Sequence, residues 1–391
     1  MQPKVSVIVS AYNSENFIRE SIESIISQSL NEIEIVIIYK FSTDKTVSIL
    51  QEYALNDTRI KMYAQTGTTG CGPAKNQGIK AAIGEFITFM DADDFYSTND
   101  CLEKLYKAAK KQNAKICGGL RSFKMIDGTI QPNSLHRKIL KKHPDGVLLR
   151  YLDYQFDYHF HSYLYDRNFI IKNDFQFGTW LVYDDCHFHA PAMFMAKEFF
   201  VIPVETYCYR LHGPYDWSYK ETMESVIGFT DMLKFSKRKK LAILHWITFC
   251  RMNQGAFHTN FVKNIDNILL FNALVQANSY IDSNLINKVQ NNMPGDDILD
   301  PMGLPNKKQI PLENGDFILK VLLYVFNNFK YKDYSDELIV IRSSMSFKIG
   351  RCMTFIPRAC RMILRSLKKN GIFMTIKICK TLLVNKLRRK S

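Results

Sequence analysis

The residues Asp91-Ala92-Asp93-Asp94 place three carboxylates directly after a mostly apolar run, Glu85 to Met90. The run has the composition of a buried β-strand, and open α/β sheets bind ligands at the carboxyl ends of their strands. Carboxylates this close raise each other's pKa unless a cation lies near them. The motif therefore predicts a site for Mg²⁺ or Mn²⁺, which prefer oxygen ligands. A capped turn is the alternative, since aspartate also caps helices that follow strands.

Strands and helices alternate in the residues before this motif. Val5 to Ser10 and Glu32 to Ile38 have strand composition, and Ile60 to Tyr63 forms a shorter third strand. Isoleucines between Ile18 and Ile26 recur at helical spacing, and another helix opens at Pro73. Nearly continuous apolar strands that alternate with helices predict an α/β fold, with a mainly parallel sheet covered on both faces.

Four short motifs in this part resemble the family 2 glycosyltransferases, whose nucleotide-binding domain has the GT-A fold. They are Ser6 to Asn13, Ser42-Thr43-Asp44, Ala74 to Gly78, and the acidic motif Asp91 to Asp94. Their order and spacing match over roughly the first hundred residues, and looser matches continue to about residue 220. The resemblance implies a Rossmann-like, mainly parallel catalytic domain over residues 1–220 and a nucleotide-sugar donor, for which a UDP-sugar is expected.

The resemblance also assigns residues to the nucleotide. The first loop, Ala11-Tyr12-Asn13, and Asp44 are expected to hold the base and the ribose. Lys75 and Asn76 are expected to lie at the donor, and Arg210 to neutralise its phosphates, because an arginine pairs well with phosphate oxygens.

A second set of residues is assigned to a divalent metal, Mn²⁺ or Mg²⁺, on the donor diphosphate. Asp93 is expected to ligate the metal directly, and Asp91 to contact the metal or the ribose. His212 is expected to complete the metal shell through a ring nitrogen. A purely structural role is the alternative for His212 and Arg210.

Lys40 is a departure from the family pattern. It stands where the family usually has an aspartate that accepts a hydrogen bond from the uracil imide. A lysine can only donate hydrogen bonds, so Lys40 could instead reach a base carbonyl or a phosphate. Three consequences stay open: altered binding of uridine, a different nucleotide, or a weakened enzyme. We favour altered binding because the metal motif is intact.

The pair Asp184-Asp185 resembles the acidic pair that ends the family's catalytic domain. In inverting members one such carboxylate takes the proton of the acceptor hydroxyl, because an alcohol is a weak nucleophile until a base does so. Asp185 is the expected base, and Asp184 takes this role if the order of the pair is reversed. A capped, solvated helix start is the alternative.

The histidines and cysteines do not predict a zinc site. His159, His161, His187 and His189 alternate along the chain but lack a cysteine framework at finger spacing. The nine cysteines are scattered without a Cys-x-x-Cys pair, which is typical of reduced thiols in a cytoplasmic protein. A strand that begins by Val5 leaves no room for a signal peptide, and no apolar run reaches the ~18 residues that span a bilayer.

Residues 343–391 hold 13 of the 52 basic residues and no acidic one. Apolar residues recur there at helical spacing, from Ile349 to Leu367 and from Ile372 to Leu387. Basic amphipathic helices lie in the interface of anionic membranes. This tail therefore predicts a peripheral protein on the cytoplasmic face of the inner membrane. Nucleic acid is disfavoured because it would not use the apolar stripe. Packing of the stripe on the protein itself is the other alternative.

Residues 221–342 carry helix-length apolar patterns without recognisable chemistry, so a helical region is expected between the catalytic domain and the tail. The resulting hypothesis is a metal-dependent, inverting glycosyltransferase that acts on a saccharide or lipid-linked acceptor. By resemblance it would serve bacterial surface glycans such as lipooligosaccharide or capsule. The alternative is a catalytically weakened GT-A domain that acts as a membrane-bound scaffold, and the intact Asp91, Asp93 and Asp185 argue against it.

Overall fold

The structure, a computed structural model, describes residues 2–292 except 69, 134, 214, 215, 254, 265 and 266. One ten-stranded sheet runs through it, in the order β3-β2-β1-β4-β9-β6-β10-β5, with β7 beside β6 and β8 beside β10. The four N-terminal strands are parallel: β1 (Val5–Ala11), β2 (Ile33–Tyr39), β3 (Ile60–Ala64) and β4 (Phe86–Asp91). They confirm the expected parallel α/β core.

The other side of the sheet is mixed, which the sequence patterns did not predict. Its strands are β5 (Phe95–Tyr96), β6 (Ile116–Lys124), β7 (Ile130–Pro132), β8 (Val147–Arg150), β9 (Tyr163–Asp166) and β10 (Glu198–Arg210). Strand β9 lies antiparallel between β4 and β6, while β6 and β10 are parallel to each other. The carboxyl ends of β4, β6 and β10 therefore point to the same edge of the sheet.

Both faces of the sheet are buried under helices, because the strands are apolar on both sides. Val5, Val7 and Val9 pack into one cluster and Ile8 into another. The first cluster is covered by α1 (Ile18–Ile26), α2 (Thr46–Asn56) and α4 (Cys101–Gln112). The second is covered by α3 (Cys71–Ala81) and α7 (Cys186–Ala196). The short helices α5 (Arg137–Lys142), η1 (Phe160–Ser162) and α6 (Arg167–Lys172) connect strands.

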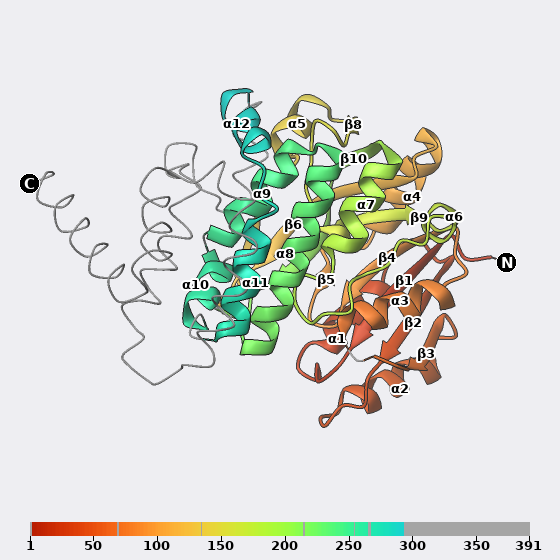
Figure 1. The fold of residues 1–391 in the computed structure, drawn as a ribbon. Helices are drawn as coiled ribbons and strands as arrows, with labels where there is room; N and C mark the ends of the chain where they lie inside the picture. The colour runs from red at the N-terminus through yellow and green to blue at the C-terminus, as the bar shows by residue number, and fades with distance from the viewer. Residues whose placement is uncertain are drawn as a thin grey trace, which may run out of the picture.

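Helices follow the sheet to the end of the described region, as expected for this part of the chain. They are α8 (Tyr219–Lys239), α9 (Ala242–Asn253), α10 (Gly255–Lys263), α11 (Ile268–Asn278) and α12 (Ser283–Asn292). A capping box of Ser218 and Glu221 starts α8, and Val226, Phe229 and Leu233 of that helix join the cluster that covers the sheet. In Figure 1 these green and teal helices lie beside the sheet rather than apart from it.

None of the helices within residues 2–292 combines the length and hydropathy needed to cross a membrane. The remainder of the expected helical region and the basic tail, residues 343–391, lie outside the described residues. The domain boundaries at 220 and 342 therefore stay predictions.

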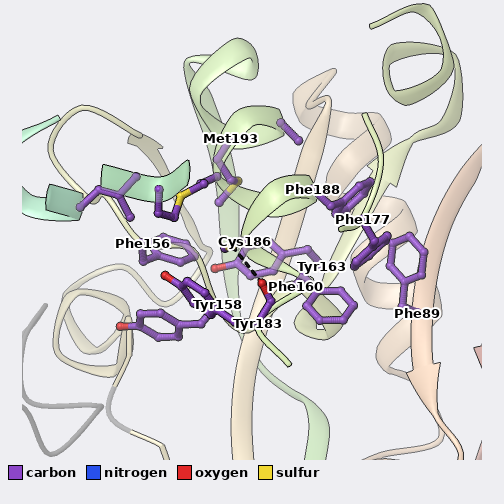
Figure 2. Packing of buried hydrophobic residues seen from close by; sticks show 14 of the residues in the cluster. Phe89, Phe156, Tyr158, Phe160, Tyr163, Phe177, Tyr183, Cys186, Phe188 and Met193 are labelled. Carbon is purple, nitrogen blue, oxygen red and sulfur yellow. Dashed lines mark hydrogen bonds between the residues drawn. The ribbon is translucent and has the colours of Figure 1, made fainter. Parts of the chain in front are cut away.

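Aromatic side chains fill the space between β4 and α7. Phe89 of β4 contacts the rings of Phe160, Phe177 and Phe188, and the last two stack with ring centroids 4.4 Å apart. Figure 2 shows these rings together, with Tyr183 beside the start of α7. Because Phe89 lies two residues before Asp91, this packing fixes the strand that carries the acidic motif.

Candidate active site

The predicted site residues come together at the carboxyl edge of the sheet. In the parallel register Ser10 lies opposite Asp91, and Ala11 lies opposite Tyr39. The loops that follow β1, β2 and β4 consequently start from one edge. Side chains from α3 and from the end of β10 reach the acidic motif at this edge.

Asp91 forms the centre of a partly buried ion cluster. Its Oδ1 lies 3.1 Å from Nζ of Lys75, and its Oδ2 lies 2.8 Å from Nε2 of His161. Burial alone would raise the pKa of Asp91, but Lys75 and His161 together outweigh it and hold the pKa well below its usual range. Burial would likewise lower the pKa of Lys75, which Asp91 and Asp184 together raise. Asp91 and Lys75 are therefore both charged at neutral pH.

His161 is a site residue that the sequence analysis set aside with the other histidines. Burial lowers its pKa to about 4 although Asp91 opposes this shift, so the ring is neutral and donates its Nε2 hydrogen to Asp91. Its ring stacks on Tyr207, with the centroids 4.7 Å apart. No spacing in the sequence distinguishes this histidine from its neighbours, since its role depends on a contact 70 residues away.

Asp93 and His212 form a more accessible pair. Asp93 Oδ2 lies 2.7 Å from His212 Nε2, and the side chains are 37% and 47% exposed. Partial burial and then the charge of Asp91 raise the pKa of Asp93. Within the described residues no cluster of three or more metal-ligating side chains exists. Two ligands suit a Mg²⁺ or Mn²⁺ ion that donor phosphates and water complete, so this pair fits the expected metal.

Asp94 and Arg210 hold β10 to the acidic motif. Asp94 accepts hydrogen bonds from the Tyr207 hydroxyl at 2.6 Å and from the Arg210 backbone N–H at 2.7 Å. The Arg210 side chain donates from Nε to the carbonyl of Asp93 at 2.8 Å and pairs with Glu20. Arg210 thus lies beside the motif as expected, although its guanidinium is already engaged by the protein.

Asp184 and Asp185 stand immediately before α7. Asp185 occupies the N-cap position of α7 but makes no capping hydrogen bond through its side chain. This disfavours the alternative that the acidic pair only caps a helix. Burial raises the pKa of Asp185 to about 7, and the charge of Asp184 adds to this shift. Asp184 Oδ2 is buried without a hydrogen-bond partner. A carboxylate whose pKa lies near neutral pH is suited to general-base chemistry.

A buried network supports this acidic pair from behind. Tyr183 adopts a left-handed backbone conformation, φ = 65°, which is costly for a residue with a side chain. Its hydroxyl donates to Asp157, which also accepts a 2.8 Å bond from Arg251 of α9. Gly228 of α8 makes room for the ring, because a Cβ there would lie 2.8 Å from Tyr183 Cδ1. The helical region therefore takes part in positioning Asp184 and Asp185.

The loops after β1 and β2 are joined by hydrogen bonds. Asn13 accepts from the Thr43 N–H, and the two carboxylate oxygens of Asp44 accept from the N–H groups of Glu15 and Thr46. The Lys40 ammonium lies 4.5 Å from the centroid of the half-exposed Tyr12 ring. Lys40 and Tyr12 therefore lie together where the nucleotide base is expected.

Asn76 is engaged within the protein. Its amide exchanges two hydrogen bonds, of 3.0 and 2.8 Å, with the backbone of Phe177. It ties α3 to the segment that leads to Asp184, so the geometry gives it a positioning role. Asp44 also has a positioning role, because its carboxylate accepts hydrogen bonds from the backbone. The donor contacts expected of Asn76 and Asp44 stay predictions.

Comparisons with known proteins agree with this fold. Residues 6–173 match the profile of glycosyl transferase family 2. Putative glycosyltransferase EpsH of Bacillus subtilis is 31% identical over 217 residues, which cover 54% of this chain and 61% of EpsH. Glycosyltransferase GlyA of Streptococcus pneumoniae is 35% identical over 145 residues, 37% of this chain and 20% of GlyA. The chain thus spans about three-fifths or less of these relatives.

The fold is also similar to a solved structure. A crystal structure of S. aureus TarS 1–349 in complex with UDP-GlcNAc superposes with a TM-score of 0.58 and 18% identity, over 72% of this chain and 82% of that one. The likeness confirms the GT-A fold. The match over residues 6–173 agrees with the family expected from the motifs, the family 2 glycosyltransferases.

The buried Arg251–Asp157 pair yields a stability prediction. Arg251→Met should lower the free energy of unfolding by about 3–5 kcal/mol, because it leaves Asp157 charged, buried and without its cation. Arg150→Met is the matched control, since Arg150 is 68% exposed and its pair with Asp153 should contribute at most about 1 kcal/mol. Urea unfolding of the two variants measures the difference. Equal losses would show that the buried pair does not stabilise the fold.

Proposed function

We propose that this chain transfers a sugar from a nucleotide-diphosphate donor to an acceptor hydroxyl, with inversion at the anomeric carbon. The observation that carries the proposal is the position of Asp185. A carboxylate with a pKa of about 7 adjoins Asp184, which interacts electrostatically with the Lys75–Asp91 cluster. The names of the relatives and the UDP-GlcNAc in the TarS crystal support a glycosyltransferase with a nucleotide-sugar donor.

The proposed reaction is a single displacement. The acceptor oxygen bonds to the anomeric carbon from the face opposite the nucleotide, and the bond from that carbon to the phosphate oxygen breaks. Asp185 takes the proton of the acceptor hydroxyl as the new bond forms, and the nucleoside diphosphate leaves with the bonding electrons. Burial, and then the charge of the neighbouring Asp184, keep the pKa of Asp185 raised, so that Asp185 is a stronger base than an exposed aspartate.

Asp93 and His212 would hold Mn²⁺ or Mg²⁺, which neutralises charge on the leaving diphosphate when it is bound. Asp91, in this proposal, either joins them or contacts the ribose. Its two oxygens face Lys75 and His161, so a ligand at Asp91 would compete with these contacts. Lys75 and Arg210 add positive charge beside the diphosphate.

A UDP-sugar is the proposed donor, with Tyr12 and Asn13 at the base. Lys40 would donate to a base carbonyl or a phosphate in place of the usual acceptor aspartate. The cation–π contact with Tyr12 supports this placement, since it keeps the ammonium at the end of β2.

The acceptor would be a saccharide or a lipid-linked glycan in bacterial surface glycan synthesis. Attachment to the cytoplasmic face of the inner membrane rests on the basic amphipathic pattern of residues 343–391.

Hydrolysis of UDP-sugars by the full chain in the presence of Mn²⁺ tests the proposal directly. A panel of nucleotide-sugars is first screened by thermal shift, since a ligand of the folded state raises the unfolding temperature. Slow release of UDP from at least one of them is the expected result. Binding without release, also in the presence of candidate acceptors, would instead support the non-catalytic scaffold.

Asp185→Asn should reduce kcat by about 10²- to 10⁴-fold with little effect on donor affinity, because a base acts in the transition state. The wild-type rate should fall as the pH drops below about 7, since protonation removes the base. Asp184→Asn is the matched variant. If only that variant is inactive, the roles within the pair are reversed.

Asp93→Asn should weaken binding of Mn²⁺ to the complex with UDP by at least about tenfold, because an amide oxygen replaces a charged ligand. Electron paramagnetic resonance of free Mn²⁺ measures this without reference to turnover. Asp100→Asn, at an exposed pair with Lys104, serves as control. Unchanged Mn²⁺ binding in Asp93→Asn would contradict the assignment.

Lys40→Ala should weaken UDP binding by about tenfold, the size of one charge-assisted hydrogen bond. Lys45→Ala, an exposed lysine on the same loop, should leave binding unchanged. Calorimetric titration with UDP compares the two variants. Equal affinities would mean that Lys40 has no part in nucleotide recognition.

A further inference from the structure

Trp180 differs from the other tryptophans of the chain in its access to solvent. The chain has three tryptophans, and the structure buries Trp217 and Trp246 but leaves Trp180 partly exposed. Trp180 belongs to the segment between α6 and α7, four residues before Asp184. An accessible indole gives a ligand a large, rigid contact surface at low entropic cost. Trp180 is therefore a candidate contact for a molecule that reacts at the acidic pair.

The indole of Trp180 is oriented with its N–H group inward. Nε1 is buried and has no hydrogen-bond partner among the described residues. It lies so close to Gly178 that a Cβ there would be 2.5 Å from it. A tryptophan at a surface usually turns its N–H group to water or to a partner. Here the single polar atom of the side chain is turned away from solvent, so whatever the side chain exposes is carbon.

Two contacts hold Trp180 beside the acidic pair. The N–H of Gly178 donates to the carbonyl oxygen of Asp184 at 2.9 Å, which closes the intervening residues into a loop. The Trp180 ring packs edge-on against the ring of His187, with the centroids 5.1 Å apart. Because His187 lies two residues after Asp185 in the first turn of α7, the indole lies next to the start of the helix that Asp185 caps.

The first turn of α3 packs against the same loop. A Cβ at Gly72 would lie 2.0 Å from the carbonyl oxygen of Gly178 and 3.0 Å from Asp184 Oδ2, so only a glycine permits this approach. Helix α3 also carries Lys75, which pairs with Asp91. The loop that bears the indole is therefore adjacent to the acidic pair on one side and to the helix that reaches the acidic motif on the other.

Polar side chains of α8 lie around this loop. Asp231 Oδ2 lies 3.3 Å from His187 Nε2, and both side chains are partly exposed. Glu224, also partly exposed, accepts a 2.7 Å hydrogen bond from the Leu181 N–H. Their spacing of seven residues places Glu224 and Asp231 on one face of α8. A carbon surface with a few accessible hydrogen-bonding groups beside it suits a sugar ring, which has an apolar C–H face and polar hydroxyls.

We propose that Trp180 is the platform on which a pyranose ring of the acceptor stacks, so that the group presented to Asp185 is a cyclic sugar. This inference rests on the proposed function, since it names the class of acceptor for the same site. The C–H face of the sugar lies against the indole and the attacking hydroxyl points to Asp185. Other hydroxyls of the same ring meet His187 and Glu224.

Three other occupants fit the indole less well. An open-chain alditol has no flat apolar face to stack on a ring. A lipid chain would cover the indole but leave the carboxylates of Glu224 and Asp231 without a polar partner from the ligand. The donor base is expected elsewhere, at Tyr12 and Lys40, which lie together after β1 and β2.

The test follows the tryptophan fluorescence of the full chain, with UDP and Mn²⁺ present, as methyl pyranosides, glucitol or 1-octanol are added. The pyranosides are those of glucose, galactose, mannose and N-acetylglucosamine. At least one should shift the emission and bind about tenfold or more tightly than glucitol. Trp246→Phe is the matched control, since it removes a buried tryptophan of a separate cluster and should keep both the shift and the preference.

Calorimetric titration measures the same affinities in variants of the platform. Trp180→Ala should remove the preference for the pyranoside, and Trp180→Phe should keep part of it because a smaller aromatic ring remains. If Trp180→Ala fails to fold, Trp180→Leu carries the comparison, because it fills the space with an apolar side chain that is not flat.

Equal affinity for glucitol and for every pyranoside would overturn the proposal, as would a preference that persists without the aromatic ring. Tighter binding of 1-octanol than of any pyranoside, with dependence on Trp180, would also overturn it by assigning the indole to a lipid chain. UDP binding and UDP release by the wild-type chain test the proposed function separately, because neither measurement requires an acceptor.

Discussion

Three carboxylates within four residues of a strand end are the constraint on which the rest of this site depends. They can coexist only because each has its own partners. Asp91 is held by Lys75 of α3 and by His161 of η1. Asp93 is held by His212, and Asp94 by the end of β10. The electrostatic requirement of one short loop therefore brings three distant segments to one edge of the sheet: α3, η1 and residues 207–212.

The same requirement explains how charge is distributed in the interior. Lys75 and Arg251 are deeply buried because each neutralises an aspartate, Asp157 being fully buried and Asp91 partly buried. The Arg251 pair also reaches from α9 to Tyr183, whose unfavourable backbone conformation precedes Asp184 and Asp185. The helices after the sheet are thus not a separate attachment. Their contacts help to position the acidic pair. Burial and the charges of Asp184 and Asp157 raise the pKa of Asp185, and Arg251 of α9 opposes this shift.

Local patterns in the sequence predicted much of this arrangement. Apolar runs located β1, β2 and β4, and the motif order led to Asp91, Lys75, Asp93 and His212, which the structure brings together. These residues lie together because a parallel sheet gathers the ends of its strands at one edge, and their roles stay predictions.

The remaining features depend on contacts that a sequence pattern does not encode. Neutral His161 is defined by its contact with Asp91, and the Tyr183–Asp157–Arg251 network joins residues up to 94 positions apart. Asn76 belongs to a recognised motif, yet its amide is used by the Phe177 backbone. No pattern in the sequence indicated that β9 lies antiparallel between β4 and β6. Its short strand is apolar on both faces, like the strands of the parallel core.

A crystal structure of the full chain with UDP and Mn²⁺, with the metal located by anomalous scattering, tests the central claim most directly. The account predicts one Mn²⁺ ion at about 2.1 Å from a carboxylate oxygen of Asp93 and also bound to His212 and the diphosphate. It further predicts that Lys75 still contacts Asp91 and that the face of the site next to Asp185 stays open for an acceptor. A metal ion and diphosphate bound away from Asp93 would contradict the account.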